Sequence, residues 1–484
     1  SYLPLTEGLL ERPHAQVTIN INGVLTQLLD KHGYTQVLEN IKELVKRGQV
    51  ELTTSAMHHA FLPLLPKSEI SRQVEINDRT NKEYFGDIYK PVGFFSPELA
   101  VNEKVLNVAS EMGYEWITAP KVAHPSGDPT PDKIFEHEKT GIKIFFRNKR
   151  VSSLILSAVC RSAQDLIKET QDLHEKDKYW FCVMDAETFG HHRIGHEKLL
   201  FEILDRTEFF EPTTPTKILD CGLEVEKTDI RPSTWTNEEQ DLWEAKSFIL
   251  WKDPSNPIHN VQWELLDFIL DQIDSFGNKN SLPYQRARDL LDKAVASDQF
   301  WWASAKPWWS LEMIEQGAFD LKDVVNVLDP GSEGVQQAEK LYRKILDLAF
   351  DWQRTGYVRK MHMENSGTYK KASLKDRTSS EWYNQLILEF EKEMNDCAKR
   401  QDFEKAIKWR DAVLKISLGT DKYDILHVLD ELWTGRNVPW AEPQVKPFLD
   451  HKWSEFSDFA KEHFRSREAD KSGLSEEEFE KWAG

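Results

Sequence analysis

The sequence predicts an α/β fold followed by a helical region. From residue 1 to about 225, short β-rich apolar runs alternate with stretches whose apolar residues recur at helical spacing, which is typical of a parallel sheet covered by helices. After Arg231-Pro232-Ser233 the spacing is helical, most clearly at residues 263–274 and 285–296. A chain of 484 residues exceeds the roughly 250–300 residues at which a single core stops growing, so two or three domains are expected.

The expected strands are short apolar or β-branched runs bounded by turn residues. They lie at residues 16–21, 49–54, 92–97, 115–119, 142–146 and 179–185. Between the first two, Leu, Ile and Val residues recur at helical spacing from Gly23 to Gly48, and a glycine in that last position is typical of a helix end. The beginning of the chain is therefore predicted to be a βαβ unit, in which helical structure connects two parallel strands.

Charge and composition argue against several classes of partner. The chain has 62 Lys and Arg against 81 Asp and Glu, a formal net charge of −19, and nucleic-acid binding is not expected because it depends on Lys and Arg neutralising phosphates. No apolar run reaches the roughly 18 residues of a membrane-spanning helix, so no membrane partner is expected. The four cysteines, at 160, 182, 221 and 397, lack metal-like spacing and suit a reducing compartment, which predicts a cytoplasmic protein.

Two of the predicted strands end in acidic residues. The apolar run that begins at Trp180 ends in Asp185 and Glu187, and the run that begins at Val92 ends in Glu98. In α/β barrels the chemistry lies at the carboxyl ends of the strands, and glycoside hydrolysis needs two carboxylates on separate elements. A single carboxylate at a strand end is more often a loop residue or a helix cap, and spacing alone does not show that Glu98 and Asp185 converge.

Three segments resemble conserved regions of a known enzyme family. Residues 93–100, GFFSPELA, and residues 184–191, MDAETFGH, are similar to the third and fourth regions of glycoside hydrolase family 57. This family includes α-amylases, 4-α-glucanotransferases, amylopullulanases and glycogen branching enzymes. Residues 48–64, GQVELTTSAMHHAFLPL, resemble the second region, with His59 on the usual histidine.

The resemblance implies a function as well as a fold. It implies a retaining reaction on α-glucans such as starch, glycogen or maltodextrin, with Glu98 as the nucleophile, Asp185 as the general acid/base, and no cofactor. It also implies an incomplete (β/α)7 barrel followed by an α-helical domain. The residues expected to bind substrate are Glu51, His59, Glu187, His191, Trp301 and Trp302.

One region of the family has no match in this sequence. The first region, a His-x-His-Gln-Pro segment on the first barrel strand, is not found, and residues 1–5 resemble the stretch that follows that strand. The expected barrel therefore lacks its first strand. The expected domains are a truncated catalytic barrel at 1–230, a helical domain that closes the site at 231–385, a helical hairpin at 386–420 and a helical tail at 421–484.

Tryptophan is concentrated in the expected helical domain. Residues 301–309 contain four indoles, and sugar rings stack their C–H faces on such planes. Packing inside a helical domain is the competing interpretation for each of them. In the resembled family a helical domain closes over the barrel and contributes aromatic side chains, which favours Trp301 and Trp302 as sugar contacts. Asp253, His259 and Trp263 loosely resemble the family's fifth region, and no catalytic role is expected for them.

Metal binding is not expected from the histidine or acidic patterns. His191, His192 and His196 lack the His-Glu-x-x-His spacing of a zinc protease, and hydrogen bonding to sugar hydroxyls is the expected role of His191. Residues 470–479 resemble a calcium loop but have Phe479 where the bidentate glutamate belongs. A capping box of Ser475 and Glu478 fits that segment better.

Residues 388–416 carry a second resemblance, to the UVR motif, a helical hairpin through which bacterial excision-repair subunits pair. The expected apolar seam is Phe390, Met394, Phe403, Ile407 and Leu414, and residues 399–402 form the expected connection. Acidic and basic residues are interspersed along both helices, so a protein partner or self-association is expected rather than DNA binding. Two other functions remain open, a zinc-dependent carbohydrate enzyme of related barrel type and a non-catalytic interaction scaffold.

Overall fold

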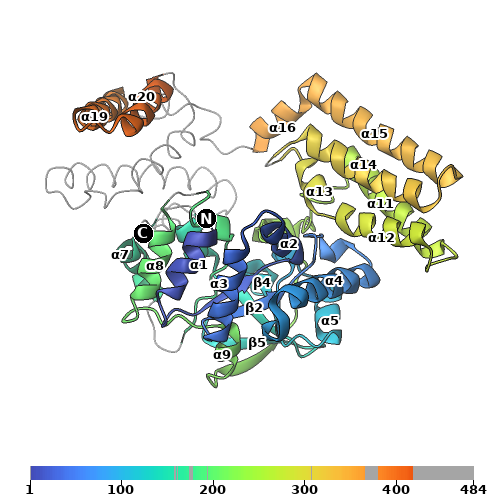
Figure 1. Ribbon diagram of the computed structural model, residues 1–484, viewed down its shortest axis with the longest axis horizontal. Coiled ribbons are helices and arrows are strands. Elements are labelled where there is room, and N and C mark those ends of the chain that lie inside the picture. The colour runs from blue at the N-terminus through green and yellow to red at the C-terminus, as the bar shows by residue number, and fades with distance from the viewer. Residues whose placement is uncertain are drawn as a thin grey trace. The chain divides into compact units, whose positions relative to one another are not determined.

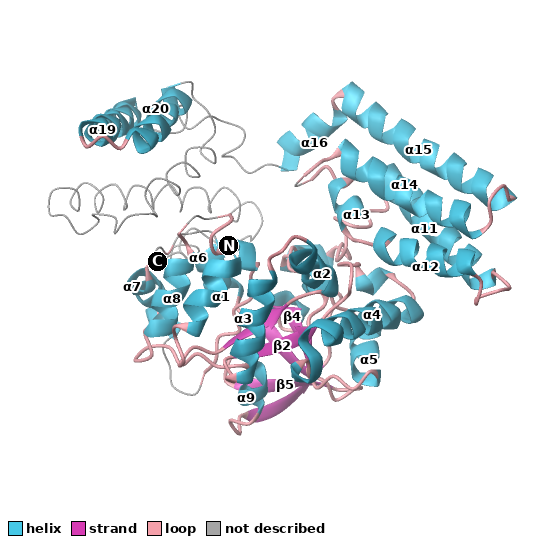
Figure 2. Ribbon diagram, viewed as in Figure 1, coloured by secondary structure: helices cyan, strands magenta, loops and turns pink. Residues whose placement is uncertain are grey.

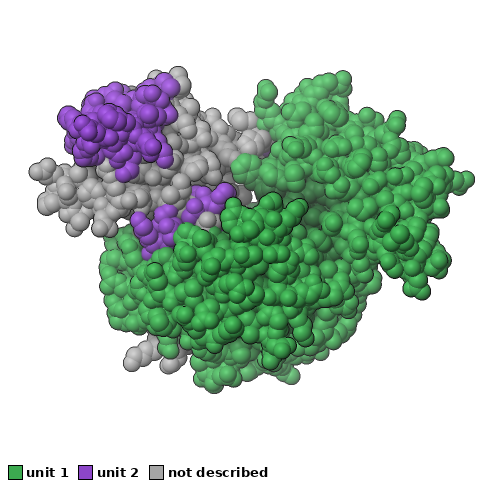
Figure 3. All heavy atoms as spheres, in the orientation of Figure 1, with its two compact units in different colours: residues 1–186, 199–359 green, residues 187–198, 360–484 purple. Residues whose placement is uncertain are grey.

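The computed structural model describes residues 2–156, 160, 162–173, 178–192, 195–306, 308–365 and 380–417. They belong to two units, one of residues 1–186 and 199–359 and the other of residues 187–198 and 360–484 (Figure 3). The predicted tail at 421–484, including the capping box at 475–478, lies outside the described residues. Within the described ranges, no helix is long and apolar enough to cross a membrane.

A seven-stranded sheet organises the larger unit (Figures 1 and 2). Its strands follow the order β1-β2-β3-β4-β6-β5-β7. Every pair of neighbouring strands is parallel except the β5–β6 pair, which is antiparallel. The strands are β1 (Val17–Asn20), β2 (Val50–Thr54), β3 (Gly93–Phe94), β4 (Trp116–Pro120), β5 (Lys133–His137), β6 (Lys143–Arg147) and β7 (Glu224–Thr228). Five of the six predicted strands are confirmed, and β5 and β7 are additional.

The predicted strand at residues 179–185 is wrong. This segment does not pair with any strand of the sheet. One backbone hydrogen bond connects it to the residue after β6, because Asn148 N–H donates to Phe181 O at 2.7 Å. The backbone of Val183 is bonded to side chains instead of a neighbouring strand. Its carbonyl accepts from Arg147 Nε at 2.9 Å, and its N–H donates to Ser152 Oγ at 3.2 Å. These side-chain contacts replace the ladder that the apolar run suggested.

Helices lie on both sides of the strands and form a separate group after residue 257 (Figure 2). The predicted βαβ unit is confirmed, because β1 and β2 pair in parallel with helices between them. Its helical stretch divides at Gly33, whose φ of +78° ends the first part. The helices of the first half are α1 (Tyr2–Leu10), α2 (Gly23–Lys31), α3 (Thr35–Lys46), α4 (Lys67–Phe85), α5 (Glu103–Glu111), α6 (Lys149–Leu156), α7 (Ala163–Glu169), α8 (Glu197–Asp205), α9 (Pro215–Leu219) and α10 (Glu239–Trp243).

The later helices of the larger unit confirm the two helical segments predicted at 263–274 and 285–296. They are α11 (Pro257–Ser275), α12 (Leu282–Ala294), α13 (Asp298–Trp302), α14 (Leu311–Leu328) and α15 (Glu333–Thr355), and α16 (Tyr357–Asn365) follows. One apolar core contains Phe94 and Ile117 of the sheet together with Leu265, Leu321 and Ile345 of these helices. Because that core is continuous, the helices are fixed against the sheet by apolar burial.

A buried ion-pair cluster also joins α4 to α12. Arg288 donates to both carboxylate oxygens of Glu69, at 3.1 and 2.8 Å, and to Asp292 at 3.1 Å. Arg72 binds Asp292 with two hydrogen bonds of 2.7 and 2.6 Å. Gln73 Nε2 donates to the Asp292 carbonyl at 2.9 Å. The cluster fixes how α12 meets α4, because each buried charge has a partner on the other helix.

We expect Arg288→Met to lower the free energy of unfolding by about 3–5 kcal/mol, because Glu69 then becomes a buried carboxylate without its counterion. Denaturant unfolding followed by circular dichroism measures the change. Arg343→Met is the matched control, because Arg343 pairs with Glu339 on an exposed helix face and such pairs contribute at most about 1 kcal/mol. An equal loss in both variants would contradict a structural role of the cluster.

The second unit contains a helical hairpin of α19 (Ser380–Lys399) and α20 (Phe403–Ser417). The hairpin and its connection at Lys399–Asp402 are as predicted, but the predicted seam is only partly correct. Phe390 is fully buried and its ring lies 5.2 Å from that of Trp409. Among the hairpin side chains that the structure describes, Cys397, Ala406, Trp409 and Ala412 are also buried. Phe403, Ile407 and Leu414 are exposed, because Trp409 turns the opposite face of α20 toward α19.

Candidate active site

The loop after β3 presents Glu98 on a strained backbone. Glu98 and the next residue, Leu99, have φ values of 61° and 47°, in the left-handed region that residues other than glycine rarely adopt. Such a conformation costs about 1–3 kcal/mol per residue and persists only where surrounding contacts enforce it. Here Val101 and Ser233 exchange two backbone hydrogen bonds of 2.9 and 3.1 Å, and Trp235 N–H donates to Glu98 O at 3.1 Å.

Both carboxylate oxygens of Glu98 are held by side chains from other segments. Oε1 lies 2.9 Å from His59 Nε2, and Oε2 accepts a hydrogen bond of 2.5 Å from the indole N–H of Trp235. The Glu98 side chain is 19% exposed, so it remains accessible from one side. Two donors that fix a partly buried carboxylate keep it oriented toward a ligand that approaches through the open side.

His59 connects this carboxylate to two further acidic residues. Burial lowers the pKa of His59, but the hydrogen bond to Glu98 and the charges of Glu98, Asp298 and Asp185 outweigh it and raise the pKa above its ordinary value. The imidazole is therefore held toward its protonated form, in which it donates to Glu98. Three carboxylates from three parts of the chain thus act on one histidine.

Asp298 is the residue of this group that sequence reasoning missed. It is the first residue of α13, and the preceding Ser297 N–H donates to His59 O at 3.1 Å. An antiparallel bridge between Ala60 and Ala296 holds the same two segments together. Burial and the charge of Glu98 raise the pKa of Asp298, and His59 opposes this shift. In the sequence, Ser297-Asp298 resembles an ordinary helix start, so no local signal distinguished it.

Asp185 lies close enough to His59 and Arg147 for its charge to act on both. At Arg147, burial lowers the pKa of the guanidinium, and Cys182 and Asp185 partly offset this effect. Glu98 and Asp185 therefore share His59 as an electrostatic neighbour. Their expected roles as nucleophile and general acid/base stay predictions.

The structure does not bring Glu51 together with Glu98. Glu51 lies near the amino end of β2, where Oε1 accepts from Thr216 Oγ1 at 2.6 Å and from Trp116 Nε1 at 3.2 Å. The Thr216 N–H donates to its other oxygen at 3.2 Å. Through these contacts the Glu51 carboxylate connects β2 to β4 and to the start of α9, so Glu51 has a structural role here.

Glu187 and His191 belong to the segment 187–198 of the second unit. Glu187 lies in a short 3-10 helix (Ala186–Thr188), and its carbonyl accepts backbone hydrogen bonds from His191 at 3.0 Å and His192 at 2.8 Å. The rings of His191 and His192 are 5.3 Å apart, and His196 stacks on Phe189. The predicted sugar contacts of Glu187 and His191 stay predictions.

Three indoles form a cluster at the end of α13. The ring of Trp301 lies 5.1 Å from that of Trp302, and Trp308 lies 6.4 and 6.2 Å from these two rings. Trp301 and Trp302 are half-buried against the core, whereas 48% of Trp308 is exposed. Trp309 packs separately on Trp352. The cluster offers partly accessible aromatic faces next to Asp298.

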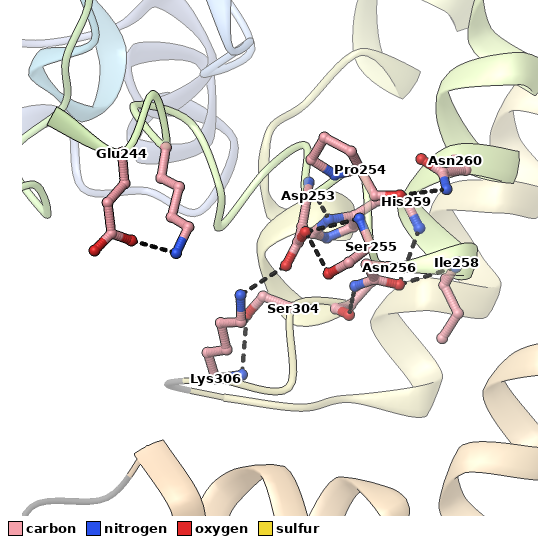
Figure 4. Close-up of polar contacts among 12 residues, drawn as sticks. Glu244, Asp253, Pro254, Ser255, Asn256, Ile258, His259, Asn260, Ser304 and Lys306 are labelled. Carbon is pink, nitrogen blue, oxygen red and sulfur yellow. Dashed lines mark hydrogen bonds and ion pairs between the residues drawn. The ribbon is translucent and has the colours of Figure 1, made fainter. Parts of the chain in front are cut away.

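Side chains at the start of α11 and in the preceding loop form a network of polar contacts (Figure 4). Two of them also fix the backbone of α13. His259 Nε2 lies 2.8 Å from Phe300 O, and Asn256 Nδ2 donates to Ala303 O at 2.9 Å. Asp253 N–H donates to His259 Nδ1 at 3.0 Å, and burial lowers the pKa of His259 to about 4. These contacts require the neutral imidazole with its proton on Nε2. Lys306 Nζ binds the Asp253 carboxylate at 2.6 Å.

The loose resemblance of residues 253–263 to a fifth family region therefore falls on supporting residues. Trp263 Nε1 donates to Trp251 O at 2.9 Å, and its ring stacks on Phe300 at 4.4 Å. Gln262 Nε2 donates to Gln299 O at 3.1 Å. Together with His259, these residues support the backbone of α13, which carries Asp298, Trp301 and Trp302.

Comparison with known proteins identifies the family. The family described as "Glycosyl hydrolase family 57" matches residues 1–231. A Methanocaldococcus jannaschii protein named "Putative alpha-amylase" is 30% identical to this chain, over 61% of this chain and 69% of that protein. The chain belongs to glycosyl hydrolase family 57. The UvrB/uvrC motif matches residues 384–418, the hairpin of α19 and α20.

Other proteins are similar at lower identity. The α-amylase of Pyrococcus horikoshii is 23% identical over 44% of this chain, and the match spans only 33% of that enzyme. In fold, the branching enzyme of Pyrococcus horikoshii has a TM-score of 0.56 at 16% identity, over 71% of this chain and 88% of that one. The α-amylase AmyC of Thermotoga maritima has a TM-score of 0.53 at 14% identity, over 72% and 90%.

We expect Asp298→Asn to lower the pKa of His59, because the substitution removes a negative charge that favours the imidazolium. Carbon-13-labelled histidine and an NMR titration measure the shift directly. Asp205→Asn is the control, since Asp205 pairs with Arg12 and His14 and does not act on His59. A His59 pKa unchanged in Asp298→Asn would contradict the grouping of Asp298 with His59 and Glu98.

Proposed function

We propose that this family 57 protein is a retaining glycoside hydrolase or glycosyltransferring enzyme that acts on α-glucans such as starch, glycogen or maltodextrin. The observation that carries the proposal is Glu98, a carboxylate on a strained loop at the end of β3, held by His59 and Trp235. The names of its relatives, α-amylase and 4-α-glucanotransferase, support the substrate class. Family membership favours this function over the zinc-dependent enzyme and the non-catalytic scaffold.

Glu98 is the proposed nucleophile. In a retaining mechanism one carboxylate attacks the anomeric carbon and forms a covalent glycosyl-enzyme, which water or a sugar hydroxyl then resolves. Attack needs a carboxylate oxygen that points in a fixed direction, and the contacts with His59 and Trp235 hold both oxygens of Glu98. The two donors also supply the orientation, so little conformational freedom remains to be lost when substrate binds.

Asp185 is the proposed general acid/base. It would protonate the leaving oxygen in the first step and deprotonate the acceptor in the second. This role requires its carboxyl group to lie roughly 5–5.5 Å from that of Glu98. The charges of both residues act on His59, which supports their placement around one site.

The remaining residues are proposed to bind the sugar chain. Asp298 carries a charge near the reacting centre and would accept hydrogen bonds from sugar hydroxyls. Trp301 and Trp302 would stack on glucose rings, with Trp308 beside them. Glu187 and His191 stay in the proposed set as sugar contacts, whereas we propose a supporting role for Glu51 through Thr216 and Trp116.

We further propose that the sheet is an incomplete (β/α)7 barrel and that a helical domain beginning near residue 231 closes its site. The TM-scores of 0.56 and 0.53 with family 57 structures support this assignment. The four cysteines, at 160, 182, 221 and 397, form no disulfide in the structure, which supports a reducing compartment such as the cytoplasm.

Glu98→Gln tests the proposed function. The amide preserves the shape of the side chain but cannot serve as a nucleophile, so release or transfer of sugar from maltoheptaose should fall by at least about a thousandfold. Oligosaccharide binding measured by calorimetry should change little. Glu111→Gln is the control, because Glu111 pairs with Lys67 on the surface. Wild-type turnover by Glu98→Gln would refute the assignment.

We also propose that the α19–α20 hairpin forms a protein contact, either with a second copy of the chain or with another protein. Its exposed face carries Leu388, Phe403, Ile407 and Leu414, which are 48–62% exposed. Exposed apolar residues grouped on a helix pair are typical of a surface that another helix covers.

Self-association of the full chain is the expected result in sedimentation experiments, and the double substitution Phe403→Ser with Ile407→Ser should abolish it. Leu282→Ser is the control, since Leu282 is a similarly exposed apolar residue elsewhere. Duplex DNA binding that weakens with salt, without self-association or a protein partner, would contradict the proposal.

A further inference from the structure

His137 is a buried histidine with one ring nitrogen left unpaired. It is the last residue of β5, and its side chain is fully buried. Nδ1 lies 2.9 Å from Thr140 Oγ1, whereas Nε2 has no hydrogen-bond partner. The Thr140 hydroxyl also accepts from Ile142 N–H at 3.4 Å. If Nδ1–H donates to Thr140, the lone pair of Nε2 is left without a donor in a buried position, which is costly.

Two carboxylates face this nitrogen. Asp229 directly follows β7, and Glu103 is the first residue of α5. One ligand atom from each of His137, Asp229 and Glu103 lies within 4.8 Å of the other two. A lone pair directed at two carboxylates is unfavourable, unless a cation lies between them.

The spacing of these atoms suits a small metal ion. His137 Nε2 and Asp229 Oδ1 are 3.5 Å apart, longer than an ordinary N–H···O hydrogen bond. Two ligands that each lie about 2.1 Å from a tetrahedral zinc ion are themselves about 3.4 Å apart. Histidines that bind metals usually donate their other N–H to a neighbouring acceptor, as Nδ1 can to Thr140 here.

We propose that His137, Asp229 and Glu103 form a binding site for a divalent transition metal of the zinc class. One imidazole and two carboxylates suit zinc better than calcium or magnesium, which prefer oxygen alone. Asp229 and Glu103 are 51% and 47% exposed, so water completes the coordination from the open side. Lys139 pairs with Glu103 Oε1, and its 59% exposed side chain is free to move aside when the ion binds.

The metal ligands Asp229 and Glu103 are end residues of the two segments, 229–235 and 98–103, that build the proposed active site. From Asp229 the chain runs through Ser233 to Trp235, and from Glu103 it runs back through Val101 to Glu98. The Val101–Ser233 bridge joins these segments between the two sites. A bound ion would therefore clamp both ends of the support for Glu98. This consequence rests on the proposed role of Glu98, whereas metal binding itself does not.

Zinc titration of the full, tag-free chain after chelator treatment tests the site. Isothermal calorimetry should show a zinc equivalent that Glu103→Gln and Asp229→Asn each weaken by about tenfold or more, since removing even an outer-shell partner costs about 10–100-fold. Cobalt should give ligand-field absorption that both variants lose. Glu138→Gln, an exposed neighbour outside the trio, is the matched control and should bind as the wild type does.

Two results would overturn the proposal. One is zinc binding in Glu103→Gln and Asp229→Asn that equals the wild type, and the other is the lack of zinc binding by the wild-type chain. Both substituted residues are exposed, and thermal unfolding checks that the variants remain folded. Glu98→Gln should bind zinc normally, so loss of the proposed activity and loss of the metal site are separable.

Discussion

The candidate site depends on one contact, the attachment of the segment before α13 to the loop after β2. The Ala60–Ala296 bridge and the Ser297–His59 hydrogen bond place Asp298 beside His59, whose imidazole in turn holds Glu98. Without this attachment, the helices after residue 257 would not contribute a carboxylate to the site. The buried cluster of Arg72, Glu69, Arg288 and Asp292 fixes the same helical region against α4, a few residues before the attachment. The two contacts together determine where α13 lies.

The second constraint is the strained backbone at Glu98 and Leu99. Left-handed φ values at two successive residues oppose stability, and the Val101–Ser233 bridge and the backbone bond from Trp235 offset them. The same chain segment, residues 229–235, therefore enforces the backbone of Glu98 and supplies the indole that binds its carboxylate. Strain placed at the proposed nucleophile is consistent with an arrangement kept for orientation rather than for stability.

The sequence predicted those parts of the structure that depend on local patterns. Apolar runs bounded by turn residues located five strands, and helical spacing located α11 and α12. Glu98 was singled out because a strand that ends in a carboxylate is visible in the sequence, and its catalytic role stays a prediction. Asp298 and Trp235 were not found, because they meet Glu98 and His59 across more than 130 positions of the chain. The run at 179–185 has a strand-like composition, yet Arg147 and Ser152 bind the backbone that a ladder would use. In α20, apolar residues lie on more than one helix face, so their spacing could not show that the face of Trp409 would be the buried one.

The most direct test of the proposed mechanism is to trap its covalent intermediate. A fluorinated glycosyl fluoride forms a glycosyl-enzyme that is hydrolysed slowly, and mass spectrometry of the digested protein then locates the sugar. Attachment of one sugar to the peptide that contains Glu98, with loss of the label in Glu98→Gln, is the predicted result. Attachment to a different carboxylate, or release of a product with inverted anomeric configuration and no labelled peptide, would contradict the account.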